Sequence, residues 1–518
     1  MPAVRSRHRN GPVTTLAVAV ATGAAVLASI GTIEPVRGPH TVTVESTAKI
    51  ADGSAVIALA DSDIYGQSAA DVGKTLDRAT ASGLRVVRIF IPWAGVQPTS
   101  SDKYDWSNVD KLVDAAASRN MQVLGAINTT PKWAAAPGVP AISGKPNSPD
   151  VYADFVGKVA SRYKGKVSAY EVWNEPNGIK FFSPVDPAAY TALLKAAYPK
   201  LKAVDPSITV VSAGLSALVD WGSSAMNPVK FLNGMYAAGA KGNFDALAFH
   251  PYQYTAKFSD GVPLENSPVN QVMDIREIMV ANGDANKKIW GTEYGEPAPG
   301  IGNESKQSAF LKDVVTKWRE LPYAGPLFIY TTRDRRSGSF SNEDNFVIYR
   351  TNWTAKPAQQ EVSSAIAAGA DARSPEFQRF SKVTAPAHGT IMSPVYPASS
   401  TVWAQIRTVD TLFEIAPGKI IASPNPIAEK VRATSKSALP IADFANGYQD
   451  FNGASALRVW YSPATGAHSA GGAIAKAWTP ALGLATSDEV RGGLGSKTTF
   501  EHGAITWAPF VGAKVTQT

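Results

Sequence analysis

Hydrophobic positions follow two alternating patterns from about residue 56 to residue 369. Short, continuous apolar runs rich in β-branched residues are typical of buried strands, and Arg-Val-Val-Arg-Ile-Phe-Ile at 85–91 is one of them. The longer segments between these runs repeat apolar residues every three or four positions, which is the period of an amphipathic helix. The chain therefore alternates predicted strands with predicted helices.

The alternation contains eight strand–helix units. The predicted strands are residues 55–60, 85–91, 122–127, 167–173, 209–213, 246–249, 288–292 and 327–331. The predicted helices after them are 69–82, 106–119, 149–163, 187–203, 229–239, 270–282, 305–321 and 356–368. Eight such units with strands apolar on both faces predict an α/β fold, a (β/α)8 barrel over residues 50–369. An open doubly wound sheet is the alternative, but no Gly-x-Gly-x-x-Gly motif follows the first strand.

The pattern changes after residue 369, where glycine, proline, serine and short β-like runs replace the helical period. We interpret residues 370–380 as a linker and 381–518 as a β-rich repeat module. Phe-Asn-Gly-Ala at 451 recurs as Phe-Glu-His-Gly-Ala at 500, each followed by a tryptophan and a Gly-Ala pair, and a weaker copy begins at Phe413.

The N-terminus has the composition of a secretory signal. Arginines at positions 5, 7 and 9 precede a small-residue apolar stretch at 14–28, which ends in Val-Leu-Ala as a possible cleavage site. Residues 1–33 are therefore predicted to be a signal peptide. The alternative is a single uncleaved anchor, because the apolar stretch extends to Ile33 and can span a bilayer.

The amino-acid composition excludes several kinds of active site and partner. The 518 residues carry a formal net charge of +7, but part of it lies at the N-terminus and no lysine/arginine run occurs elsewhere, so we expect no nucleic-acid partner. The absence of cysteine excludes a disulfide framework, cysteine zinc sites, iron–sulfur clusters and thiol catalysis. With only six histidines, we expect no metal and no cofactor. Carboxylates, hydroxyls, amides and aromatics must carry the chemistry.

Two carboxylates follow barrel strands at the end where a barrel builds its active site. Glu175 stands in Trp-Asn-Glu-Pro after the fourth strand, and Glu293 in Thr-Glu-Tyr-Gly after the seventh. Double-displacement glycoside hydrolysis needs such a pair: one carboxylate attacks the anomeric carbon, and the other protonates the leaving oxygen and then activates water. Of their neighbours, Glu171 is expected to lie deeper and Glu296 to be a rim residue.

Sugar rings stack their C–H faces on aromatic side chains, and aromatics crowd the same strand ends. We expect Trp133, Tyr254 and Tyr330 to wall the sugar subsites and Asn128 to bind a hydroxyl. The Arg-Asp-Arg-Arg run at 333–336 is interpreted as a solvated loop, with contact to an anionic glycan as the alternative.

These strand ends resemble the clan of retaining glycoside hydrolases with catalytic glutamates after strands four and seven. Residues 55–368 are most similar to family 39 and cellulase-like family 5 enzymes. The resemblance implies hydrolysis of a β-linkage, with Glu175 as acid/base and Glu293 as nucleophile. The other matched positions are Asn174 for the amide that binds the sugar 2-hydroxyl, Arg88 for the strand-two arginine near the nucleophile, and His250 and Tyr252 for the His-x-Tyr pair that borders and hydrogen-bonds the nucleophile.

The C-terminal repeats resemble the LGFP repeat of secreted actinobacterial envelope proteins. The sequence Leu-Gly-Leu-Ala at 482 departs from that family's phenylalanine, so the match depends on the surrounding Phe-x-x-Gly-x-Ile-x-Trp and Gly-Ala pattern. The resemblance implies a module that anchors the protein at a mycolic-acid-type cell wall. A small β domain that only stabilises the barrel is the alternative.

Together these features predict an exported, envelope-associated retaining glycoside hydrolase that acts on a polysaccharide. A transglycosylase that uses the same covalent intermediate is one alternative. A non-catalytic, glycan-binding envelope protein is another.

Overall fold

The structure is a computed structural model that describes residues 48–518 except 301, 347, 384–385, 436 and 454–455. The predicted signal peptide or anchor at 1–33 lies outside the described residues. Within the described ranges, no helix has both the length and the apolar character needed to cross a bilayer.

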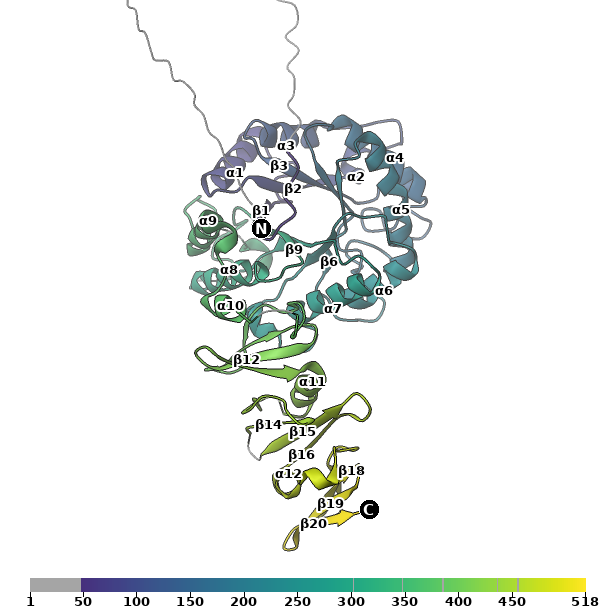
Figure 1. Cartoon of the computed structure of the whole chain (residues 1–518). Coiled ribbons are helices and arrows are strands. Elements are labelled where there is room, and N and C mark those ends of the chain that lie inside the picture. The colour runs from purple at the N-terminus through teal and green to yellow at the C-terminus, as the bar shows by residue number, and fades with distance from the viewer. Residues whose placement is uncertain (1–47, 301, 347, 384–385, 436, 454–455) are drawn as a thin grey trace, which may run out of the picture. The chain divides into compact units, whose positions relative to one another are not determined.

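Parallel strands form the ring at the centre of the larger domain (Figure 1). They are β1 (Ile57–Ala60), β2 (Val86–Pro92), β3 (Gln122–Asn128), β4 (Ala169–Val172), β5 (Thr209–Ser212), β6 (Leu215–Ser216), β7 (Leu247–His250), β8 (Ile289–Tyr294) and β9 (Ala324–Tyr330). Their order is β5-β4-β3-β2-β1-β9-β8-β7-β6. A parallel bridge from Val211 in β5 to Ala246 beside β7 closes the ring. Since β5 and β6 are two halves of one interrupted strand, the predicted (β/α)8 barrel is confirmed.

Helices surround the ring of strands (Figure 1). They are α1 (Ala69–Ala81), α2 (Trp93–Val96), α3 (Ser107–Ala117), α4 (Pro149–Arg162), α5 (Pro187–Val204), α6 (Pro228–Ala237), α7 (Pro268–Ala281), α8 (Glu304–Trp318) and α9 (Pro357–Ala368). Short polar side chains accept hydrogen bonds from the first-turn N–H groups of five of them, at Ser68, Ser148, Asp186, Asn227 and Ser267. The short helix α2 was not predicted, because four residues show no period.

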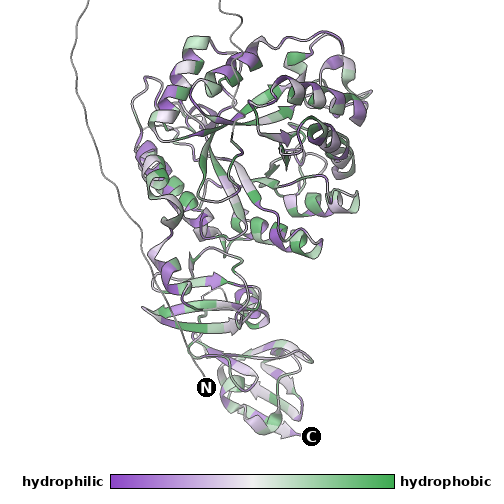
Figure 2. Cartoon of the chain, turned by 45° about the horizontal axis from the view of Figure 1, so that its top comes forward, coloured by the Kyte–Doolittle hydropathy of each residue, from purple (hydrophilic) through white to green (hydrophobic). Residues whose placement is uncertain are grey.

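An apolar layer fills the barrel interior below the strand ends. Trp290 and Phe328 stack there with ring centroids 6.4 Å apart, and the indole of Trp290 donates to Asp52 at 2.6 Å. The strands are mostly coloured as hydrophobic in Figure 2. Such an interior is a packed core, so polar chemistry belongs to the carboxyl ends of the strands.

Three antiparallel sheets follow the barrel. The first contains β10 (Tyr396–Pro397), β11 (Trp403–Ile406), β12 (Asp410–Ala416) and β13 (Lys419–Pro424). The second contains β14 (Tyr448–Phe451), β15 (Leu457–Ser462) and β16 (Gly466–Gly471). The third contains β17 (Val490–Gly492), β18 (Gly495–Phe500), β19 (Gly503–Ala508) and β20 (Gly512–Gln517). The β-rich repeat module is confirmed, and the phenylalanines of the three copies lie in β12, β14 and β18.

Three further helices accompany these sheets: α10 (Pro375–Phe380), α11 (Asn425–Thr434) and α12 (Gly472–Ala477). Helix α10 occupies part of the segment that we interpret as a linker, and its Phe377 and Phe380 are buried against Val395 and Leu412. The division into barrel, linker and repeat module at residues 370–380 remains a proposal.

Candidate active site

The two glutamates at the carboxyl ends of the fourth and seventh barrel strands, β4 and β8, meet at the mouth of the barrel. Glu293 is the fifth residue of β8, and Glu175 follows β4 by three residues. One carboxylate oxygen of each, together with a ring nitrogen of His250, lies within 4.8 Å of the others. Glu175 and Glu293 line a cavity of about 490 Å³. The barrel topology therefore brings together two residues that are far apart in the sequence.

Arg88 joins the acidic groups at the base of this cavity. Its guanidinium is 2% exposed and donates to both oxygens of Glu171, at 2.6 and 3.1 Å. The same group donates to a carboxylate oxygen of Glu293 and, at 2.8 Å, to Oδ1 of Asn174. Because the amide oxygen of Asn174 accepts from Arg88, its amide nitrogen is the group left to donate to a ligand.

The surroundings of Glu293 favour its ionised form. Burial alone raises the pKa of this carboxyl group, but Arg88, His250 and the Tyr252 hydroxyl together hold the pKa below its usual value. The Tyr252 hydroxyl donates to Oε2 of Glu293 at 3.1 Å. Glu293 is thus a charged carboxylate at neutral pH.

His250 is fully buried between the two glutamates. Its Nδ1 lies 2.8 Å from Oε1 of Glu175 and its Nε2 lies 3.0 Å from the Thr292 hydroxyl. We expected the His-x-Tyr pair to hydrogen-bond the glutamate after strand seven; Tyr252 does so, whereas the hydrogen bond of His250 goes to Glu175. Burial lowers the pKa of His250, but the nearby carboxylates of Glu293 and Glu175 more than offset this and raise it above the usual value.

Glu171 hydrogen-bonds more groups of the site than its sequence position predicted. Its carboxylate is fully buried and, besides Arg88, accepts from the Gly214 N–H at 2.8 Å and the Thr292 hydroxyl at 3.4 Å. Glu296, which we expected at the rim, is also fully buried and pairs with Lys306 at 2.7 Å. Burial raises the pKa of Glu296 to about 7, since Lys306 offsets only part of the desolvation. Glu296 is not a rim residue because α8 covers its loop.

Comparisons with known proteins identify the family. The model of the cellulase family, glycosyl hydrolase family 5, matches residues 50–320, which is just over half of the chain. The chain belongs to glycosyl hydrolase family 5. It is therefore an O-glycosyl hydrolase. The LGFP repeat model matches residues 438–481 of this family 5 hydrolase, which confirms the LGFP-like repeat.

Several solved structures are similar to this chain at low sequence identity. A family 39 glycoside hydrolase from Bacteroides cellulosilyticus WH2 is 18% identical, with 70% of this chain and 71% of that chain covered and a TM-score of 0.50. A monomeric beta-xylosidase from Caulobacter crescentus CB15 is 18% identical, with 71% and 74% covered and a TM-score of 0.47. GH5_18 from Streptomyces cattleya in complex with GlcNAc is 16% identical, with 63% and 82% covered and a TM-score of 0.46. A search of curated proteins finds no match.

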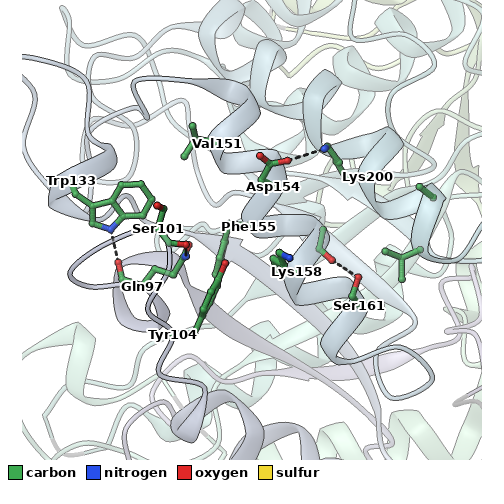
Figure 3. A pocket seen from close by; sticks show the side chains of 13 residues that line it. Gln97, Ser101, Tyr104, Trp133, Val151, Asp154, Phe155, Lys158, Ser161 and Lys200 are labelled. Atoms are coloured by element: carbon green, nitrogen blue, oxygen red, sulfur yellow. Dashed lines mark hydrogen bonds and ion pairs between the residues drawn. The ribbon is translucent and has the colours of Figure 1, made fainter.

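Not all of the expected sugar-contacting residues reach the cavity of this family 5 hydrolase. Tyr254 and Tyr330 line it. Asn128 lines an adjoining cavity of about 690 Å³, and its Oδ1 is buried without a hydrogen bond in the described part of the chain. Trp133 lines neither cavity. Its indole donates to the Gln97 carbonyl at 2.8 Å, and it borders a separate cavity beside α4 (Figure 3).

Several residues that line the cavity beside Glu175 and Glu293 were not predicted, because they lie in loops whose paths no local pattern records. They are Ser62, Lys180, Leu218, Glu343 and Phe346, and Phe90 of β2 lines the same cavity. Arg335 belongs to the run that we interpreted as a solvated loop. It is exposed, as that interpretation predicts, and it also lines the cavity and pairs with Asp63 at 2.6 Å.

The two glutamates and His250 are also the groups to consider as metal ligands. In the part of the chain that the structure describes, Glu175, His250 and Glu293 are the one group of three side chains close enough to share a metal ion. The Arg88 guanidinium already contacts Glu293, and a second cation beside it is disfavoured by charge repulsion. The arrangement suits acid/base and nucleophilic chemistry of carboxylates.

Proposed function

We propose that this hydrolase cleaves β-glycosidic bonds of a polysaccharide with retention of the anomeric configuration. The observation that carries the proposal is the pair of oxygens, from Glu175 and Glu293, within 4.8 Å of each other. Retaining enzymes hold their two carboxyl groups about 5–5.5 Å apart, whereas inverting enzymes leave about 6.5–9.5 Å for a water molecule.

Glu293 is the nucleophile of the first step. Its ionised carboxylate attacks the anomeric carbon, a bond from that carbon to a Glu293 oxygen forms, and the bond to the leaving oxygen breaks. Arg88 and Tyr252 support this role, because both donate hydrogen bonds to the charged carboxylate. Glu175 gives its proton to the leaving oxygen.

Glu175 is the base of the second step. When Glu293 is esterified its negative charge is gone, and Glu175 takes a proton from the water that attacks the anomeric carbon and releases Glu293. The hydrogen bond from His250 engages Oε1 of Glu175. Oε2 is therefore the oxygen that faces the leaving group and then the water.

Stereochemistry tests the retaining mechanism directly. The first product released from an aryl β-glycoside, followed by NMR before mutarotation, is expected to be the β-anomer. Clean formation of the α-anomer would show inversion and contradict the assignment of Glu293 as a nucleophile.

We also propose that the protein is exported and associates with the cell envelope through its C-terminal repeats. The LGFP match at 438–481 and the basic, then apolar, N-terminal sequence support this proposal. The ligand class would be a cell-wall glycan or a mycolyl envelope. Pull-down on isolated cell walls tests it, with the shortened chain described in the Discussion as comparison.

A further inference from the structure

The loop between β6 and α6 displays a tryptophan to solvent. Trp221 is 78% exposed, whereas every other tryptophan in the described ranges is at least partly buried. Large exposed aromatics are uncommon on a folded surface, and clusters of exposed apolar residues mark interaction sites. Val219 of the same loop and Ile179 of the β4–α5 loop are exposed as well, at 54% and 43%. We call these three residues the rim patch.

Hydrogen bonds hold the rim patch in place. The Asn177 amide donates to the carbonyls of Ser216 and Met226 at 2.8 and 2.9 Å, and so ties the two ends of the tryptophan loop to the loop that carries Glu175. The Ile179 N–H donates to the Ser224 carbonyl at 2.9 Å. The Trp221 N–H donates to the Ala225 carbonyl at 3.0 Å within a tight turn. The indole therefore extends from a backbone that is already ordered, which limits the entropy lost when a ligand binds.

The rim patch borders the catalytic cavity. Ala217 and Leu218, at the start of the tryptophan loop, line this cavity together with Glu175. Trp221 comes three residues after Leu218, so their Cα atoms are at most about 11 Å apart. Lys180, next to Ile179, lines the cavity from the other loop. A chain of sugars that leaves the cavity between these two loops would pass the rim patch.

We propose that Trp221 is an additional sugar-binding subsite, on which a residue of a polysaccharide chain stacks outside the cavity. The proposal rests on the proposed function, since it takes the substrate to be a β-linked glycan chain. The chemistry favours a sugar, because the C–H face of a pyranose covers an exposed indole while its hydroxyls remain hydrated. A protein bound on the rim patch would instead lie beside the entrance to the cavity.

Binding without turnover tests the subsite. In a Glu293→Gln background, calorimetry measures the affinity for β-1,4-linked gluco-, manno- and xylohexaose with Trp221, Trp221→Ala or Trp221→Phe. For the hexaose that binds, we expect Trp221→Ala to weaken the affinity about tenfold and Trp221→Phe to restore most of it. Phe510→Ala removes another fully exposed aromatic, in the turn between β19 and β20, and should leave the affinity unchanged.

Turnover gives a second readout. In the active enzyme, the ratio of kcat/KM for the hexaose to kcat/KM for the matching aryl glycoside should fall about tenfold in Trp221→Ala, mainly through KM. An unchanged affinity and an unchanged ratio, an equal loss on both substrates, or no binding of any hexaose would each overturn the subsite. If the unmodified enzyme hydrolyses no aryl glycoside, the proposed function is refuted instead. The calorimetric comparison still tests the subsite in that case, because it measures binding without turnover.

Discussion

At the scale of single residues, Arg88 connects the charges of the site. Its guanidinium lies between the carboxylates of Glu171 and Glu293 and also binds the Asn174 amide oxygen. Arg88 donates four hydrogen bonds to these three partners, one more than the three donors of a lysine ammonium can make. The ionised state of Glu293 therefore depends in part on a buried arginine that also binds Glu171.

The proton that we propose Glu175 supplies should matter most for poor leaving groups. We expect Glu175→Ala to lower kcat/KM by about 10²–10⁴-fold for an alkyl or oligosaccharide leaving group. The loss in the first step should be far smaller for a dinitrophenyl glycoside, whose leaving group departs without protonation. Equal losses in kcat/KM on both substrates would contradict the acid role of Glu175.

Tyr252→Phe should change the pH dependence of the reaction. The Tyr252 hydroxyl helps to hold the pKa of Glu293 below its usual value, so its removal raises that pKa. The ionised fraction of Glu293 then falls at acid pH, and the acid limb of the kcat/KM profile moves to higher pH. Tyr254→Phe, which removes a hydroxyl of the same cavity that makes no hydrogen bond to Glu293, serves as the control; identical profiles for all three proteins would refute the role of Tyr252.

The buried pair of Glu171 and Arg88 should be costly to break. Glu171→Gln places an amide N–H₂ where one oxygen now accepts from Arg88 or from Gly214, and we expect a loss of about 3–5 kcal/mol in the free energy of unfolding. The exposed pair of Arg119 and Asp77 provides the control, because Asp77→Asn should cost less than about 1 kcal/mol. Denaturant unfolding measures both losses, and similar values would show that the buried pair contributes no more to stability than the exposed pair.

At the scale of elements, the interruption between β5 and β6 makes room for the imidazole of His250. Gly214 lies in this break, donates its N–H to Glu171, and allows His250 to approach its Cα closely. A Cβ atom at position 214 would lie 2.0 Å from Nε2 of His250. A regular strand with a side chain here would exclude the imidazole from its place beside Glu175.

Gly214→Ala should therefore impair both stability and catalysis. The displaced imidazole costs about 1–3 kcal/mol of overpacking, and kcat should fall because Glu175 loses its hydrogen bond. Gly53→Ala is the matched control, since nothing lies within 4 Å of a Cβ at that position. Wild-type thermal stability and kcat in Gly214→Ala would show that His250 can move without consequence.

At the scale of the whole molecule, the first C-terminal sheet differs from the other two. Tyr396, Val402 and Phe413 belong to the same hydrophobic cluster as the barrel core. The repeats around the LGFP match have clusters of their own, one of which includes Ile427 of α11. A shortened chain should therefore keep the first sheet and end before α11.

A chain that ends at Pro424 is expected to retain aryl glycoside hydrolysis and the thermal stability of the barrel, and to lose binding to isolated cell walls. Co-sedimentation with the walls, with turnover measured on the same samples, provides the test. Equal sedimentation of the two chains would refute the anchoring role of the repeats. A shortened chain that loses turnover would show that the repeats stabilise the barrel.

The sequence by itself determined the barrel, the β-rich repeats and the two glutamates at strand ends. These features are encoded locally, by the period of apolar residues and by which residue follows each strand, and parallel closure converts strand-end positions into proximity. Only the tertiary structure decided that His250 binds Glu175, that Trp133 borders another cavity, that Arg335 lines the catalytic one and that Glu296 is buried. Loop paths and side-chain directions depend on contacts between residues far apart in the chain, which no local pattern records.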